Sequence, residues 1–275
     1  SFGCSGGADS MALALALFAE RGEQKIIPVV VDHGLQTGSD QITSQVVSKL
    51  KSIGYQQVES AVAQVVVTDG LEASARRARY KVFNQFIDSY QPKYFFLAHT
   101  LNDQAETVLL GLARGSGARS LAGMAVENNL YVRPLLKISR QITEAACVEA
   151  GMTFWNDPHN QDIKFSRVRV RKNVLPNLEE NLGPGITDAL VRSADLLRDD
   201  ADALDGFAPQ MNIKITNAKI MSMLCGLYLN FLEHIATPLL QNLAIHLVQN
   251  LAIPLVQNRA IPLVQNPRQN RVVEK

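Results

Sequence analysis

Apolar runs of strand length alternate with segments of helical periodicity along the first half of this chain, and this alternation limits the possible folds more than any other feature. The strand-like runs lie at residues 26–31, 62–67 and 94–97. Helical periodicity is found at residues 39–53, 70–87 and 102–113, with Ser39-Asp40 and Thr68-Asp69 as expected N-caps and Gly54 as an expected C-cap. Repeated alternation of this kind builds a parallel sheet covered by helices. We therefore expect an α/β fold with a parallel twisted sheet and helices on both faces.

Strand signals fade beyond residue 136, and residues 141–150, 168–182 and 186–207 all have helical periodicity. The expected organisation is a sheet domain at 1–135, a helical extension at 136–208 and an atypical tail at 209–275. The tail contains four octets over residues 236–267: ATPLLQNL, AIHLVQNL, AIPLVQNR and AIPLVQNP. Proline at the same place in three octets forbids one continuous helix, and four short units are too few for a capped solenoid. We expect this tail to be poorly ordered, of low complexity and without catalytic residues.

The composition fits a globular enzyme, with 47% hydrophobic and 19% charged residues. The formal net charge is only +1, so any nucleic-acid binding must come from local basic patches. Three widely spaced cysteines, Cys4, Cys147 and Cys225, argue against a zinc ribbon, an iron-sulfur ligand set and a secreted disulfide framework. We expect a protein of the reducing cytoplasm that does not cross a membrane.

The string Ser5-Gly6-Gly7-Ala8-Asp9-Ser10 comes directly before an apolar helix-like segment. Paired glycines at a helix N-terminus let unpaired amides approach a diphosphate without a Cβ in the way. The serine hydroxyls could add donors, and Asp9 could cap the helix or hold magnesium. An ordinary Gly-Ser turn is the alternative for a short Ser-Gly-Gly alone. The loop is not a Walker A motif, because the Gly-Lys-Ser/Thr ending is missing. Only Ser1 to Cys4 precede it, so we expect an incomplete first strand.

Polar residues follow two of the predicted strands, in Val31-Asp32-His33-Gly34 and Leu97-Ala98-His99-Thr100. The carboxyl ends of parallel strands open on one ligand crevice, so these two exits and the glycine loop should converge there. Each could also be a simple strand exit, and His33 could serve only a local hydrogen bond.

Charged side chains form two further signals. Asp103 and Glu106 are three residues apart, which puts both carboxylates on one side of a helical first turn, suited to an ammonium group or magnesium. Acids that complement a helix dipole are the alternative. Basic residues cluster at Arg76, Arg77, Arg79 and Lys81, and again at Arg167, Arg169, Arg171 and Lys172. Arginines suit phosphates of ATP or RNA, whereas a solvated helix face is the alternative.

Two motifs carry a family resemblance. Ser-Gly-Gly-x-Asp-Ser resembles the signature of the N-type ATP-pyrophosphatases, also called PP-loop or adenine nucleotide alpha hydrolase-like proteins. The string His99-Thr100-Leu101-Asn102-Asp103-Gln104-Ala105-Glu106-Thr107 resembles the His-x-x-Asp-Asp-Gln-x-Glu-Thr motif of the tRNA(Ile)-lysidine synthetase family. Matching strings elsewhere include Gly70-Leu71-Glu72-Ala73, Arg114-Gly115-Ser116-Gly117, Gly123-Met124, Arg133-Pro134-Leu135 and Asp157-Pro158-His159-Asn160. The resemblance covers about residues 3–208. Asn102 departs from it, because the family motif usually has an aspartate there.

The resemblance implies ATP-dependent ligation of free L-lysine to carbon 2 of the wobble cytidine in the isoleucine tRNA with a CAU anticodon. An adenylated tRNA intermediate would form, and AMP and pyrophosphate would be released. The implied site residues are, for ATP, Ser5, Gly6, Gly7, Ala8, Asp9, Ser10, His33 and Arg76; for catalysis, Asp32, His99, Asp103, Glu106 and Arg114; for lysine, Asp103 and Glu106; for tRNA, Arg133, Arg167, Arg169 and Arg171; and for Mg²⁺, Asp9 and Asp32.

Two alternatives remain open. One is another tRNA-modifying enzyme of the same superfamily, although a thiolase of the cytidine type would need paired cysteines and an amidotransferase would need a glutaminase domain. The other is a nucleotide- or RNA-binding relative with impaired catalysis, suggested by Asn102 and the unusual tail. A large gain in turnover from Asn102→Asp would indicate a damaged enzyme.

Overall fold

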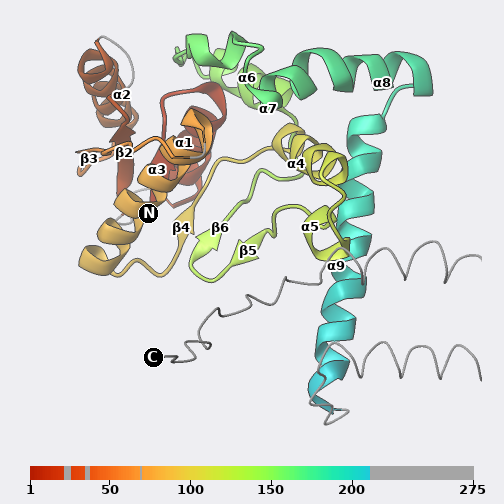
Figure 1. The fold of residues 1–275 in the computed structure, drawn as a ribbon. Coiled ribbons are helices and arrows are strands. Elements are labelled where there is room, and N and C mark those ends of the chain that lie inside the picture. The colour runs from red at the N-terminus through yellow and green to blue at the C-terminus, as the bar shows by residue number, and fades with distance from the viewer. Residues whose placement is uncertain (22–25, 35–37, 69, 211–275) are drawn as a thin grey trace, which may run out of the picture. The chain divides into compact units, whose positions relative to one another are not determined.

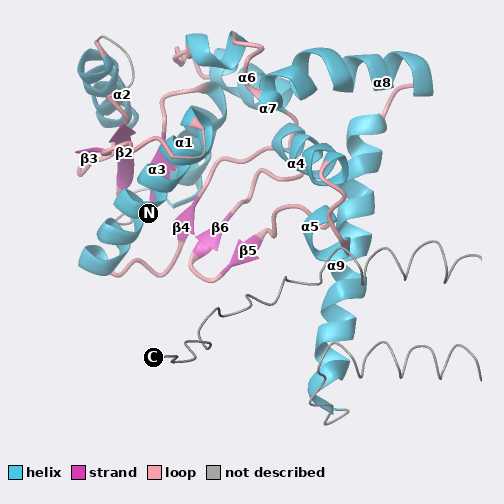
Figure 2. Cartoon of the chain, viewed as in Figure 1, coloured by secondary structure: helices cyan, strands magenta, loops and turns pink. Residues whose placement is uncertain are grey.

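A computed structural model describes residues 1–21, 26–34, 38–68 and 70–210. Its sheet has six strands in the order β3-β2-β1-β4-β6-β5 (Figures 1 and 2). The strands are β1 (Phe2–Cys4), β2 (Pro28–Asp32), β3 (Glu59–Val62), β4 (Phe95–Phe96), β5 (Glu127–Asn128) and β6 (Tyr131–Val132). All pairs are parallel except β5 with β6, which form an antiparallel edge. The expected α/β class with a mostly parallel sheet is therefore confirmed.

Helices connect and flank these strands. They are α1 (Ala8–Arg21), α2 (Ser39–Ile53), α3 (Leu71–Tyr90), α4 (Leu101–Ala113), α5 (Ala118–Leu121), α6 (Arg140–Glu149), α7 (Ser166–Arg169), α8 (Leu175–Leu182) and α9 (Ile186–Gln210). A 3-10 turn, η1, covers Pro158–Gln161, and a π-helical stretch, η2 (Val170–Val174), joins α7 to α8. No helix among the described residues is long and apolar enough to cross a membrane.

Helices cover both faces of the sheet. Successive strand residues point to opposite faces, so the sheet contributes to one core on each side. Phe2 and Val30 belong to a core with residues of α1 and α2. Val29 and Phe95 belong to a second core with Phe83 and Phe86 of α3. Cys147 of α6 is buried in the first core, so this helix packs directly on the layer formed by α1. Residues 1–207 form one compact unit, and the octet repeats lie outside the described residues.

The third strand lies earlier than the sequence predicts. β3 ends at Val62, which is 71% exposed, and Val66 and Val67 are also exposed. Pairing with β2 fixes the register, with Val29 opposite Glu59 and Asp32 opposite Val62. The strand predicted at 62–67 was therefore wrong in its limits, because pairing with β2 ends at Val62, although Ala63 and Val65 still pack against Ala78 and Val82 of α3.

Both predicted N-caps were wrong, while the predicted C-cap is confirmed. α2 is capped by Gly38 and α3 by Gly70, and neither cap position makes a side-chain hydrogen bond. Asp69 lies outside the described residues. Gly54 ends α2 in a conformation with φ of 124°, and its N–H bonds to the last carbonyls of the helix. Ser39 and Thr68 match the residue type of a cap but not its position, which only the local backbone decides.

Candidate active site

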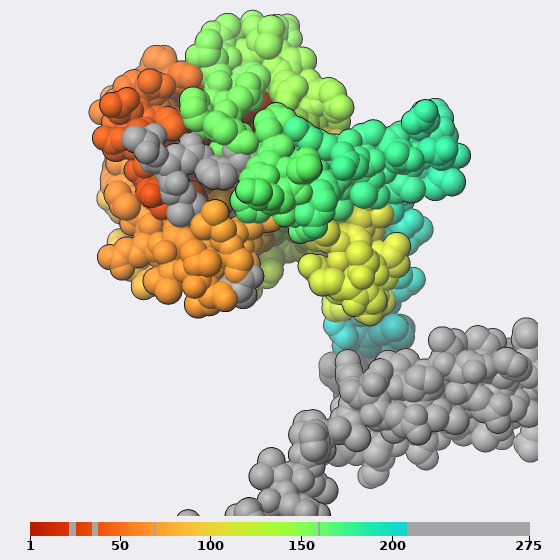
Figure 3. Space-filling model, turned by 45° about the horizontal axis from the view of Figure 1, so that its top comes forward, coloured from red at the N-terminus to blue at the C-terminus, as the bar shows by residue number. Residues whose placement is uncertain are grey.

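A cavity of about 680 Å³ opens at the carboxyl ends of the central parallel strands. Its wall includes the glycine loop after β1, the exits of β2 and β4, one side of α3, and the segments from α6 to η2. In Figure 3 the orange α3 and the green segments after residue 140 lie beside one another on this part of the surface. The structure thus brings together the three loops that the sequence predicts to converge, in a cavity large enough for a nucleotide.

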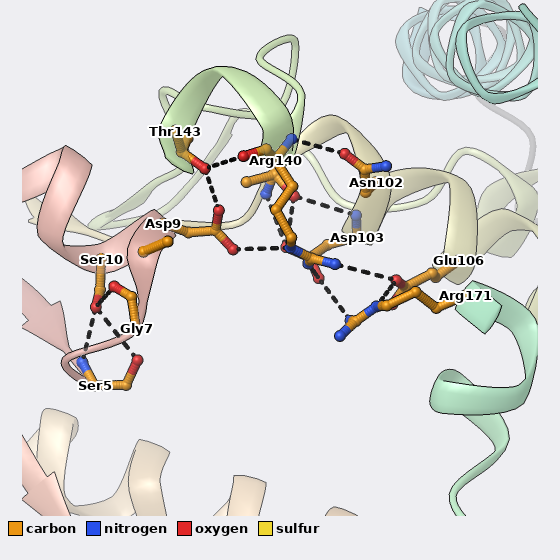
Figure 4. Close-up of polar contacts among 12 residues, drawn as sticks. Ser5, Gly7, Asp9, Ser10, Asn102, Asp103, Glu106, Arg140, Thr143 and Arg171 are labelled. Carbon is orange, nitrogen blue, oxygen red and sulfur yellow. Dashed lines mark hydrogen bonds and ion pairs between the residues drawn. The ribbon is translucent and has the colours of Figure 1, made fainter. Parts of the chain in front are cut away.

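The glycine loop is shaped by backbone that only glycine adopts without strain at its centre. Gly6 has a φ of 80°, and a Cβ there would lie 2.3 Å from Cγ2 of Val46. The Ser10 hydroxyl donates to the Gly7 carbonyl (2.9 Å) and accepts the Ser5 N–H (3.2 Å), as Figure 4 shows. Ser10 therefore closes the loop from inside, while Ser5 and Gly7 line the cavity.

Asp9 connects the glycine loop to α6. Its carboxylate accepts the Thr143 hydroxyl (2.5 Å) and Nε of Arg140 (3.3 Å). Burial raises the pKa of Asp9 above its usual range, and the bonds from Thr143 and Arg140 act in the opposite direction. The carboxylate lines the cavity. It is therefore both a structural tie and an accessible oxygen ligand.

The first turn of α4 carries the acidic motif. Thr100 and Asp103 form a reciprocal capping box, in which Oδ2 of Asp103 accepts the Thr100 N–H at 2.9 Å. Burial alone would raise the pKa of Asp103, but Arg140, His99 and the Thr100 amide together hold it below its usual value. Asp103 therefore caps its own helix, while its other oxygen, Oδ1, accepts a hydrogen bond from Arg140 at the cavity wall.

Glu106 lies one turn further along α4 and is fully buried. It accepts two hydrogen bonds from Arg171, at 2.6 Å from Nε and 3.1 Å from Nη2. Asp103 lies 3.8 Å from the same guanidinium, so the predicted common side of the two carboxylates is observed. Glu106 does not line the cavity itself, whereas its partner Arg171 does; Figure 4 shows the pair.

Two histidines border the cavity, and both are neutral at pH 7. Burial lowers the pKa of His33 to about 4, with the Arg79 charge adding to the shift. Burial likewise lowers the pKa of His99 to about 4, although Asp103 opposes it. Nδ1 of each ring is buried without a hydrogen-bond partner among the described residues. Each ring can therefore receive a donor or a proton from a bound ligand.

Three further arginines line the cavity. Arg76 and Arg79 come from α3, and Arg167 comes from α7. Nε of Arg79 is buried and makes no hydrogen bond within the described part of the chain. Arg167 donates to the Thr107 hydroxyl at 2.8 Å and lies 3.8 Å from Glu72. This part of the lining carries more positive than negative charge, which suits an anionic ligand.

The structure places some predicted site residues away from the cavity. Arg114 is exposed at the C-terminal end of α4, and Arg169 is exposed and donates to the carbonyls of Ile163 and Lys164. Arg133 is only 6% exposed and donates to the Ala125 carbonyl, so its contact with tRNA stays a prediction for a side chain that is buried in this structure. The motif proline in Arg133-Pro134-Leu135 signals a turn, which gives no information on burial.

Sequence reasoning missed several residues that shape the site. Arg140 lines the cavity and was assigned no role, while Arg79 was noted only as a member of a basic cluster. Gln104 lies in the predicted motif, yet its function depends on a distant loop: its amide pairs with both N–H and C=O of Met124, at 2.8 and 2.9 Å. The only sequence signal for this pairing is Gly123, whose φ of 62° and close approach to Gln104 leave no room for a Cβ.

Magnesium fits the oxygen ligands that the cavity offers. Mg²⁺ is usually held by one or two carboxylates together with substrate phosphates and water. Asp9 and Asp32 both line the cavity, and Oδ1 of Asp32 accepts only the Gly34 amide among the described contacts. Within the described residues no three His, Cys, Asp or Glu side chains gather into a protein-only metal site. The arrangement therefore suits an ion that enters with phosphates.

Comparison with known proteins agrees with this geometry. Residues 1–178 match the family model described as a PP-loop domain. The tRNA(Ile)-lysidine synthase of Thermobifida fusca is 50% identical over 209 residues, which cover 75% of this chain and 64% of that protein. The corresponding enzyme of Streptomyces coelicolor is 47% identical, over 78% of this chain and 62% of its own length. The chain thus spans somewhat less than two thirds of these relatives.

A solved structure shares the fold. The U34-tRNA thiolase of Methanococcus maripaludis, determined with its [4Fe-4S] cluster, superposes with a TM-score of 0.59 and 20% identity, over 72% of this chain and 71% of that one. At this identity the likeness concerns the fold alone. The family match over residues 1–178 and the glycine loop at the mouth of a parallel sheet lead to one assignment: this chain belongs to the PP-loop domain family, a family of ATP-using domains.

Proposed function

We propose that this protein ligates free L-lysine to carbon 2 of the wobble cytidine in the isoleucine tRNA with a CAU anticodon, using ATP. The observation that carries the proposal is that a single cavity joins a phosphate loop, at Ser5 and Gly7, to an acidic helix turn at Asp103. The similarity to tRNA(Ile)-lysidine synthases at up to 50% identity supports the choice of substrates.

The first half of the reaction is adenylation. The 2-oxygen of the cytosine attacks the α-phosphorus of ATP, a new P–O bond forms, and the bond to the β-phosphate breaks with release of pyrophosphate. Amides at the start of α1 hold the phosphates, and Arg76 and Arg79, which line the same cavity, balance the charge of the departing group. Mg²⁺, held by Asp9 and Asp32, would neutralise phosphate charge when bound.

The second half is substitution at the activated ring. The lysine side-chain amine attacks carbon 2, the C–O bond to AMP breaks, and the amine gives up a proton. The α4 carboxylates draw the ammonium end of lysine toward the adenylate, with Asp103 at the cavity wall and Glu106 behind it. His99 is neutral at pH 7, so it is in the form that accepts a proton. Arg167 and Arg171 line the same cavity and their positive charge suits RNA phosphate, although Arg171 is already paired with Glu106.

A direct test is release of pyrophosphate from ATP in the presence of the CAU-anticodon tRNA, with and without lysine. We expect full turnover to require both, and AMP to form in step with a tRNA whose mass increases by one lysine less one water. Ornithine, one methylene shorter, serves as the matched control substrate. If AMP and pyrophosphate are released in full turnover equally well without lysine, the proposed amine substrate is wrong. If they are released equally well with a tRNA that has another anticodon, the proposed tRNA is wrong.

A further inference from the structure

One side chain joins the two halves of the cavity. Arg140, the first residue of α6, lies 3.3 Å from Asp9 of α1 through Nε and 3.1 Å from Asp103 of α4 through Nη2. Its Nη1 lies 3.9 Å from Glu106. The side chain is only 21% exposed, so these pairs are largely shielded from water. A planar fork of donors can hold carboxylates from two helices at once, which the single ammonium of lysine cannot do in the same geometry.

The backbone N–H of Arg140 is held by the first turn of α4, the turn that also carries Asp103. Oδ1 of Asn102 accepts the Arg140 N–H at 2.8 Å (Figure 4). Ser139, the N-cap residue of α6, makes no side-chain capping bond, so Asn102 supplies an acceptor from a different helix. Thr143, one turn further, is 2% exposed and donates to Asp9. The start of α6 is thus tied to α1 and α4 by both backbone and side chain.

We propose that Asn102 and Arg140 are a pair of positioning residues, in which Asn102 sets the start of α6 and Arg140 holds Asp9 of the phosphate loop in register with Asp103. The pair fixes the distance between the nucleotide half and the amine half of the cavity. The expected effect on turnover rests on the proposed function, whereas the contacts of Asn102 and Arg140 are observed independently of it.

The role of Asn102 explains why asparagine serves at this position. The contact uses only a side-chain oxygen, which asparagine and aspartate share. An aspartate would also face the N-terminal end of α6, where negative charge is favourable. The asparagine therefore does not mark a damaged enzyme, and Asn102→Asp should produce no large gain in turnover.

The test compares Asn102→Asp, Asn102→Ala and Arg140→Lys with wild type, with Arg192→Gln as an exposed arginine control on α9. For Asn102→Asp we expect kcat and both KM values within about twofold of wild type, because the hydrogen-bond acceptor is retained. For Asn102→Ala and Arg140→Lys we expect kcat to fall by about tenfold to a hundredfold, because small displacements of reacting groups are costly. The KM for ATP should change by less than about threefold, because the amides of the glycine loop are retained and Thr143 still donates to Asp9.

Amide hydrogen exchange gives a readout that does not depend on the reaction. Exchange at the start of α6 should speed up in Asn102→Ala and stay slow in Asn102→Asp. The inference is overturned if Asn102→Ala keeps wild-type exchange or wild-type kcat, if Asn102→Asp is as impaired as Asn102→Ala, or if Arg140→Lys retains full turnover. If wild type itself shows no lysine-dependent turnover, the proposed function fails, and exchange alone then decides whether Asn102 holds α6.

Discussion

Substituting Gly6 by alanine should damage the phosphate loop in two separable ways. The residue has a φ of 80°, and an added Cβ would lie 2.3 Å from Cγ2 of Val46, where 3.4 Å is an ordinary contact. The left-handed backbone alone costs about 1–2 kcal/mol for alanine. Forcing the methyl against α2 adds about 1–3 kcal/mol of overpacking. We therefore expect Gly6→Ala to lower the free energy of unfolding by about 2–5 kcal/mol in urea denaturation followed by circular dichroism.

Gly115 provides a matched control, because its φ is 64° and a Cβ there would meet nothing within 4 Å. Gly115→Ala should show only the backbone cost of about 1–2 kcal/mol. Adding Val46→Ala to Gly6→Ala should relieve the clash, with a coupling free energy of about 1–3 kcal/mol in the double-mutant cycle. Equal losses for Gly6→Ala and Gly115→Ala, together with additive behaviour of Gly6→Ala and Val46→Ala, would refute the proposed packing of the loop against α2.

Three further predictions concern buried or capping groups. Burial lowers the pKa of His99 from 6.5 to about 4, so the unfolded chain binds a proton that the folded chain does not. Stability should fall as the pH drops from 6.5 toward 4, by about 2 kcal/mol at pH 5, and urea titrations of His99→Asn should lack this component. Gln104 is 2% exposed and its Nε2 donates to Met124, so Gln104→Glu should cost at least about 2 kcal/mol, whereas an unchanged denaturation midpoint would contradict that pairing. Glu179 accepts amides at the start of α9, and these bonds lower its pKa to about 2. Glu179→Gln should lower Tm at pH 7, and the difference from wild type should shrink as the pH falls toward 2, as followed by thermal melts.

The fold could be predicted where an element carries its own periodicity. α4 and α6 have an apolar face over several turns, and the structure places them within one residue of the predicted limits. β5 and β6 were missed because each has two residues, too few for any alternation to be read. The strand predicted at 62–67 was wrong because its composition was misleading. β-Branched residues such as Val66 are typical of strands, but pairing with β2 ends before them.

The site could be predicted where topology alone brings residues together. Asp32, His99 and the glycine loop all end parallel strands, so a sheet model is sufficient to make them neighbours. Arg140 is different, because it meets Asp9 across 131 positions and no local pattern marks it. The burial of Arg133 could not be read from its motif either, since it depends on tertiary contacts such as the one to the Ala125 carbonyl.

The charges of the network limit which ligand the acidic turn can accept. Asp9, Asp103 and Glu106 share the guanidiniums of Arg140 and Arg171, which leaves one net negative charge when all are ionised. A second anion next to these carboxylates would be repelled, whereas one ammonium group would complete the balance. In the proposed reaction ATP brings its own negative charge to the same cavity, which Arg76 and Arg79 also line. If the proposed substrates are correct, an amine at Asp103 and a nucleotide at the glycine loop each reduce the electrostatic cost of binding the other, so each ligand should tighten the binding of the second.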